Sequence, residues 1–258
     1  MTETMLRERT KHRSSFSGTV RGEMIKAGRS RSLVLLAWFA IMLSAVTAYG
    51  YAVVGAESGQ EPVAVVDDIV RAWMMVFLFS GVFAAMYVAR EFDSRVINRT
   101  VLLAGTRQSV LASKLLVTVF FGACFGVLAA VGGAASAVIL PLVLDEHPAW
   151  STEATWTLVG VVVCCVLSAL WGAGLGLAVR HQLTAILIVV GLTLLVDPGL
   201  QRIWPEASNG LFTIALSSLY LDPKPELLPV PVAALIAVAW ITAAIAFGGW
   251  RFLRKDLP

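Results

Sequence analysis

Long apolar runs alternate with short polar segments along the whole chain. We expect membrane spans over 33–56, 72–89, 115–144, 154–179, 183–196 and 227–250, and none of these runs carries a charged side chain. A helix needs about 20 apolar residues to cross the hydrocarbon core of a bilayer. The pattern therefore predicts an all-α integral membrane protein with six transmembrane helices.

The fifth run is the shortest, with only 14 residues before the sequence Asp197-Pro198. Proline ends or bends a helix. A second apolar piece, Leu211–Leu221, is too short to cross the membrane. We expect short re-entrant or outer helices in the region 197–226. Two interpretations stand here, the outer mouth of a transport pathway or a loop packed on the outer surface.

The first 32 residues are polar and basic, and we assign 1–32 to a cytoplasmic tail followed by a surface helix. Phe16, Val20 and Met24 are spaced four apart, which is typical of an amphipathic helix lying along the membrane interface. We expect this helix over Phe16–Arg29, then a transmembrane domain over 33–250, and a cytoplasmic tail over 251–258.

Two further local patterns are informative. Gly122 with Gly126, and Gly172 with Gly176, have the small-residue spacing that lets helices approach closely. Arg71 follows Asp67 by four residues at the outer end of the second span, which permits an ion pair. The alternative for Arg71 is a side chain that extends to the membrane surface.

Composition agrees with a membrane protein. Of the 258 residues, 58% are hydrophobic and 14% are charged, whereas soluble domains carry about 25% charged residues. The three cysteines all lie within apolar runs and have no CxxC spacing, so we interpret them as packing residues.

The two signs of charge are segregated along the chain. The segments 1–32, 89–114, 180–182 and 251–258 hold 17 of the 20 Lys and Arg residues, and the other segments hold 11 of the 17 acidic residues. Basic segments stay on the cytoplasmic side. We expect a multi-pass protein of the inner (cytoplasmic) membrane with both termini in the cytoplasm. This topology explains the basic residues without nucleic-acid binding.

A charged segment, 89–114, separates the second and third spans. It cannot lie in hydrocarbon, because each charge at the bilayer centre costs about 2.5–3.5 kcal/mol or more. Its middle part, VINRTVLLAG, is apolar enough to favour a docking element over a solvated loop. Val96, Val101 and Leu102 are candidates for the apolar docking face.

Motifs for independent chemistry are missing. The sequence has no GxxxxGK[ST] nucleotide loop, no HExxH and no GxSxG, and its three histidines lie in three different segments. We expect no metal site and no catalytic residues. The uncharged spans also argue against a proton-coupled transporter, which usually buries ionisable groups. The energy for any transport is therefore expected from another protein.

The order of motifs resembles the membrane permease subunits of bacterial type-2 ABC exporters in their six-span form. The similarity includes Glu91, a short helix over Phe92–Leu103, a turn before Arg107, and Lys114 at the next span. It also includes the inner turn Val179-Arg180-His181-Gln182 and the approach EMIKAGRSRS before the first span. The family commonly has Gly at the position of Arg95 and Pro near Thr106.

This resemblance implies a function that composition does not give. A dimer of separate cytoplasmic ABC ATPase subunits would bind ATP and Mg, and this chain would need no cofactor. The segment 89–114 would act as the coupling helix, with contacts from Glu91, Arg95, Val96, Arg99, Thr100, Leu102, Gly105 and Arg107. A second copy or a sister permease would complete a pathway that exports an amphipathic or apolar substrate, such as a drug, lipid or peptide.

Two alternatives belong to other classes. A membrane-embedded enzyme, a protease or a lipid-processing enzyme, would act on its substrate without ATP. A non-transporting scaffold would bind partners without ATP-dependent flux.

Overall fold

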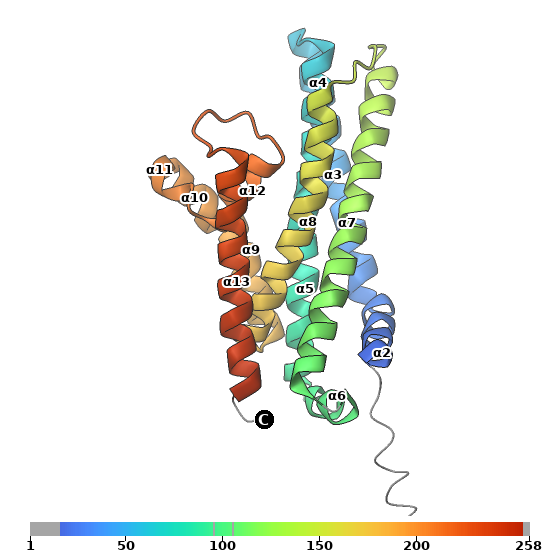
Figure 1. The fold of residues 1–258 in the computed structure, drawn as a ribbon. Helices are drawn as coiled ribbons and strands as arrows, with labels where there is room; N and C mark the ends of the chain where they lie inside the picture. Colours follow the sequence, from blue (N-terminus) through green and yellow to red (C-terminus); the bar gives the residue numbers. More distant parts are fainter. Residues whose placement is uncertain (1–15, 95, 105, 255–258) are drawn as a thin grey trace, which may run out of the picture.

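The computed structural model describes residues 16–94, 96–104 and 106–254, and within these ranges all regular structure is helical. Six helices are long and apolar enough to cross a membrane, which confirms the predicted all-α, six-span fold. They are Arg31–Ser58, Pro62–Asp93, Arg107–Val143, Thr152–Val179, Gln182–Ile203 and Val230–Arg254. Figure 1 shows them as an elongated bundle. We call the end at Arg31 and Arg254 the inner end and the opposite end the outer end, after the predicted orientation.

Two helices, α5 (Val76–Asp93) and α8 (Thr152–Val179), form the centre of the bundle. Their backbones touch at glycine: a Cβ atom added at Gly172 would lie 2.2 Å from the carbonyl oxygen of Gly81. Gly176 meets the Ala85 carbonyl in the same way. The predicted small-residue spacing therefore marks a close contact between helices, as expected for membrane packing.

The third span, α7 (Arg107–Val143), also packs against α8. Gly122 and Gly126 face α8, where added Cβ atoms would lie about 3 Å from the backbone of Val162 and Val166. α7 has 37 residues. At 1.5 Å per residue this length exceeds a hydrocarbon core of about 30 Å, so part of α7 extends beyond the membrane.

The second span begins before the expected Ala72, because α4 (Pro62–Arg71) continues through a 3₁₀ turn (Ala72–Met75) into α5. The predicted ion pair between Arg71 and Asp67 is wrong. Arg71 pairs with Asp68 at 2.6 Å and with Glu153 of α8 at 3.3 Å. Asp67 instead accepts a hydrogen bond from Ser151, the residue that caps the amino end of α8.

The fifth span does not end at Val196. α9 (Gln182–Gly191) continues through a π-helical turn (Leu192–Val196) into α10 (Asp197–Ile203). Pro198 lies in the first turn of α10, directly after the π-helical turn, and does not end the span. The span therefore includes the buried side chain of Asp197, so the expectation that the spans carry no ionisable group is wrong here.

The outer region contains α10, α11 (Pro205–Ser208) and α12 (Phe212–Leu219). The last span, α13 (Val230–Arg254), follows them in the sequence. Phe212 stacks on Trp171 of α8, whereas Leu219 lies against Gly160. Trp171 is eleven residues nearer the inner end of α8 than Gly160, a distance of roughly 16 Å. α12 thus runs obliquely along α8, and its position relative to the membrane stays a prediction.

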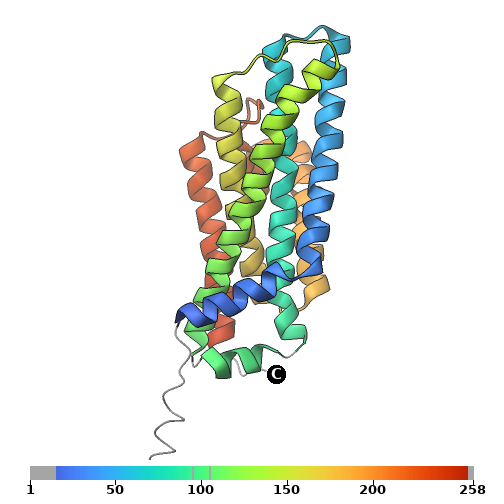
Figure 2. The ribbon, with the colours of Figure 1, turned by 90° about the vertical axis from the view of Figure 1, so that its right-hand side faces the viewer.

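The amino-terminal helix α2 (Phe16–Gly28) lies across the inner end of the bundle, in front of α7 in Figure 2. It continues into the first span, α3 (Arg31–Ser58). Val20 and Met24 pack against the hydrophobic core, as the helical spacing predicts. The most buried long side chain of α2 is nevertheless acidic, since Glu23 is only 1% exposed.

Candidate functional site

The short helix α6 (Ile97–Ala104) lies crosswise at the inner end of the bundle, near α2 (Figure 2). It is shorter than the expected helix over Phe92–Leu103, because α5 itself continues through Asp93. Ser94 then ends α5, since both its N–H group and its hydroxyl donate to the Arg90 carbonyl. Between the second and third spans, the described residues therefore contain one separate helix, α6.

Thr106 begins the next helix. Its hydroxyl accepts a hydrogen bond of 3.1 Å from the backbone N–H of Ser109, which satisfies a free donor in the first turn of α7. Two turns later α7 carries Lys114. This side chain is 1% exposed, so its charge needs partners from the protein.

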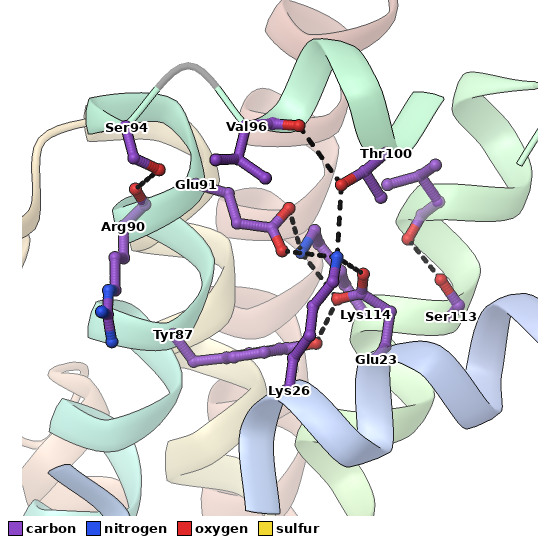
Figure 3. Close-up of polar contacts among 11 residues, drawn as sticks. Glu23, Lys26, Tyr87, Arg90, Glu91, Ser94, Val96, Thr100, Ser113 and Lys114 are labelled. Atoms are coloured by element: carbon purple, nitrogen blue, oxygen red, sulfur yellow. Dashed lines mark hydrogen bonds and ion pairs between the residues drawn. The ribbon is translucent and has the colours of Figure 1, made fainter. Parts of the chain in front are cut away.

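Lys114 is held between two carboxylates from different helices. Its Nζ atom lies 2.9 Å from Oε2 of Glu23 on α2 and 2.8 Å from Oε2 of Glu91 on α5. Glu23 and Glu91 are themselves 1% and 8% exposed. The three side chains form a buried contact between α2, α5 and α7 (Figure 3).

Lys26 extends this contact to α6. Its Nζ atom lies 2.7 Å from Glu23 Oε1, 3.2 Å from Glu91 Oε1 and 3.2 Å from the hydroxyl of Thr100 on α6. The phenol of Tyr87 on α5 donates a hydrogen bond to Glu23. We call Glu23, Lys26, Tyr87, Glu91, Thr100 and Lys114 the inner cluster, and Figure 3 shows how they converge.

The inner cluster has two positive and two negative charges, so it is neutral when all four ionise. Burial alone would raise the pKa of Glu23, but the charge of Lys114 and the hydrogen bonds from Lys26 and Tyr87 lower it to about 2. For Lys26, burial acts to lower the pKa, and the two glutamates reverse this and raise it. The network therefore favours the charged form of both groups.

The predicted contact residues divide into two sets. Glu91 and Thr100 are buried and turned toward the inner cluster, so they join α6 to the bundle. Val96 is 40% exposed and Leu102 is 81% exposed. Val101 is half-buried, and Ile97 is fully buried. α6 thus fixes one face to the bundle and presents another.

The remaining predicted contacts are basic residues and a glycine. Arg107 donates hydrogen bonds to the carbonyl oxygens of Phe252 and Leu253, at 3.2 and 3.1 Å, and so connects α7 to the inner end of α13. Arg95, Gly105 and the side chain of Arg99 lie outside the described residues.

Sequence reasoning did not single out Glu23, Lys26 or Tyr87 as site residues. A signal for Glu23 was present: at helical spacing it shares the face of Val20 and Ala27, the face that an amphipathic helix buries. An acidic residue on that face requires a cation, and Lys114 supplies it. Tyr87 gave no such signal, because an aromatic residue in a span is ordinary.

The inner ends of the other spans are joined by backbone carbonyl groups. Arg180 donates to the carbonyl oxygen of Arg251 at 2.6 Å, and Arg251 donates to that of Ala178. Partial burial lowers the pKa of Arg180, and the charges of Arg251 and Arg107 lower it further. Asp93 accepts a hydrogen bond of 2.8 Å from the N–H of Gln182, which connects α5 to α9.

A cavity of about 190 Å³ lies in the outer half of the chain, between α5, the π-helical turn and α12. Apolar side chains and hydroxyl groups line it, among them Met74, Phe77, Leu78, Thr193, Thr213 and Tyr220. Gln201 and the ion pair of Asp222 with Lys224 also contribute to the lining. Among the described residues, no group of three His, Cys, Asp or Glu side chains is placed to hold a metal ion.

Six helices long and apolar enough to cross a membrane, with a buried charge network at one end of the bundle, are the features of a multi-pass membrane protein. The sequence matches the family model for the ABC-2 family transporter protein over residues 19–196, from α2 to the π-helical turn. The chain belongs to the ABC-2 transporter family. Comparison with curated proteins gives no match. ABC-2 permeases are transport subunits, generally without a nucleotide site of their own.

Proposed function

We propose that this chain is the permease subunit of an ATP-driven exporter in the inner membrane, with α2, α6 and both termini on the cytoplasmic side. A separate cytoplasmic ABC ATPase dimer binds ATP and Mg and docks on the exposed face of α6. The segregation of basic residues supports this orientation, because α2, α6 and the carboxyl end of α13 lie at one end of the bundle (Figure 1).

The observation that carries the proposal is the double role of α6. Leu102, at 81% exposure, offers an apolar contact to a partner outside the chain. Thr100, two residues earlier, is buried against Lys26 and so connects α6 to α2, α5 and α7. A partner that moves α6 therefore acts on the second and third spans directly.

The substrate that fits best is amphipathic or apolar. The outer cavity supports this class, because thioether and aromatic side chains line it beside the hydroxyl groups of Thr193 and Thr213. Two permease chains, either two copies or this chain and a sister, would form the pathway between them. Exposed leucines on α9, Leu183 and Leu187, provide apolar surface for such a contact or for lipid.

The test is co-purification of an ATPase from the native membrane in mild detergent. We expect a stoichiometric soluble ATPase with the wild-type chain, and its loss with Leu102→Glu. Leu253→Glu is the matched control, because Leu253 is also exposed and lies at the inner end, on α13. An intact complex with Leu102→Glu, or no ATPase with the wild type, would contradict the proposal.

A further inference from the structure

A second feature of the inner end is a hollow of about 440 Å³ beside the inner cluster. It lies between the α2–α3 junction and the inner part of α5. Its volume is within the usual range of small-molecule sites, about 300–1,000 Å³. We call it the inner pocket.

The rim of the inner pocket is basic. Lys26, Arg29 and Arg90 line it, and the one acidic lining residue, Glu91, is already paired with Lys114 and Lys26. Within the part of the chain that the structure describes, the guanidinium groups of Arg29 and Arg90 contact no acceptor and both residues are exposed. Figure 3 shows Arg90 directed away from the inner cluster. Two bidentate donors are therefore available to an anion.

The amino end of α3 adds to this charge. Ser30 and Ser32 line the pocket, and the first turn of the 28-residue helix α3 has no side-chain cap. Free backbone N–H groups and the helix dipole at such an end attract phosphate groups. The hydroxyl groups of Ser30, Ser32 and Ser94 provide further donors around the same space.

The surroundings of the pocket are apolar on the side of the membrane. Phe83, Met86 and Tyr87 form its floor. Above Ser32, the residues Leu35, Phe39 and Met42 follow at helical spacing on α3, and they are 57%, 52% and 44% exposed. A ligand with an anionic head and long apolar tails would match both the basic lining of the pocket and the apolar surface of α3.

We propose that the inner pocket binds the phosphate headgroup of an anionic phospholipid of the inner leaflet, with its acyl chains along Leu35 and Phe39. Basic pockets between helices on the cytoplasmic side of membrane proteins recognise such headgroups. The site does not depend on an ATPase, so its test is separate from the test of the proposed function. A bound lipid would contact α2, α3 and α5 together.

The experiment titrates the purified full-length chain with dioleoyl phosphatidylglycerol or dioleoyl phosphatidylcholine and measures bound lipid by native mass spectrometry. We expect the anionic lipid to bind at least tenfold more tightly. Each basic residue near an anionic lipid contributes about a fivefold change in affinity, so Arg29→Gln/Arg90→Gln should weaken phosphatidylglycerol binding by about 25-fold. Phosphatidylcholine binding should stay within about twofold of the wild type.

The matched control is Arg21→Gln/Arg254→Gln, which removes the same charge from exposed positions of α2 and α13 outside the pocket. It should change phosphatidylglycerol binding by less than about twofold. Equal losses in the two double variants would show attraction to general charge and would overturn the site. Both variants should unfold at the temperature of the wild type, because the guanidinium groups of Arg29 and Arg90 make no contacts to lose.

A competition experiment separates a lipid from a free anion. Inorganic phosphate and glycerol 3-phosphate carry the headgroup chemistry without acyl chains, and neither should displace phosphatidylglycerol at equal concentration. Displacement at equal concentration would assign the pocket to a soluble phosphate and overturn the lipid assignment. Retention of the lipid, together with the loss in Arg29→Gln/Arg90→Gln, would establish the site.

Discussion

The Lys114 ammonium group of α7 lies 2.8 Å from the Glu91 carboxylate of α5, and both side chains are almost fully buried. Their contact joins the second and third spans at the inner end of the chain. Glu23 of α2 approaches the same ammonium from the other side, at 2.9 Å. One lysine thus neutralises carboxylates from two helices, and its loss should strongly lower the stability of the folded chain.

We predict that Lys114→Met strongly destabilises the protein. Methionine keeps the length of the side chain but leaves Glu23 and Glu91 with only Lys26, which is 44% exposed. Breaking a buried pair by removing one partner costs about 3–5 kcal/mol. The measurement is thermal unfolding of the purified chain in detergent.

A second lysine provides the control for this variant. Lys224 pairs with Asp222 at 3.1 Å and is 48% exposed, so Lys224→Met should cost about 0–1 kcal/mol. Equal effects of the two variants would mean that the inner cluster adds little to stability beyond an ordinary surface pair.

The inner cluster should also give the protein a defined dependence on pH. The pKa of Glu23 falls from an ordinary value of 4.5 to about 2 in the folded chain. A lowered carboxyl pKa contributes stability above the unfolded value, and this contribution disappears as the pH falls from about 4.5 toward 2. The raised pKa of Lys26 also stabilises the folded chain, and this contribution is lost when the pH rises through the folded pKa of Lys26 into the alkaline range.

The measurement is the unfolding midpoint of the wild type and of Glu23→Gln between pH 7 and pH 3. We expect the wild-type midpoint to fall steeply below about pH 4.5. Glu23→Gln should be less stable at pH 7 and show a flatter acid limb, since glutamine does not titrate. Parallel curves for the two proteins would assign acid unfolding to other groups.

The contact between α5 and α8 makes a separate prediction. Gly172→Ala should destabilise the bundle, because the new Cβ atom would lie 2.2 Å from the Gly81 carbonyl oxygen and both backbones would have to move. Overpacking of this kind typically costs about 1–3 kcal/mol. Gly191→Ala is the control: it adds the same methyl group to a helix where no atom lies within 4 Å. It should be neutral or stabilising by about 0.5–1 kcal/mol.

The spans, their small-residue contacts and the surface helix were predictable, because lipid imposes a length and a periodicity that the residues show directly. The fifth span was not. Asp197-Pro198 has the composition of a helix end, and only the local structure reveals that a π-helical turn carries the helix past it. The depth of α12 depends on the contact of Phe212 with Trp171, which no local pattern encodes.

The candidate site was only partly predictable for a similar reason. The exposed position of Leu102 agrees with the expected docking face. The partners of Glu91 lie 65 residues before it and 23 residues after it along the chain, on α2 and α7. The sequence indicates Glu91 as a contact for another protein, because it does not show that Lys26 and Lys114 of the same chain lie beside this carboxylate.

The final prediction separates docking from transmission. Lys26 connects α2 to Thr100 of α6, and its side chain is 44% exposed, so Lys26→Met should cost at most about 1 kcal/mol of stability. Lys114 remains to neutralise the buried glutamates. Leu102 remains exposed on α6, so the ATPase should still co-purify. Movement of α6 would no longer act on α2.

Coupling between two sites is typically worth about 1–3 kcal/mol, which is at least fivefold in the coupled process. We therefore expect Lys26→Met to lower ATP hydrolysis by the reconstituted complex about fivefold or more. The assay is run in phosphatidylcholine alone, so that anionic lipid in the inner pocket does not contribute. Arg21→Met is the control on the same helix and should hydrolyse ATP like the wild type. If the Lys26→Met complex hydrolysed ATP at the wild-type rate, α6 would transmit its movement through α5 and α7 without α2.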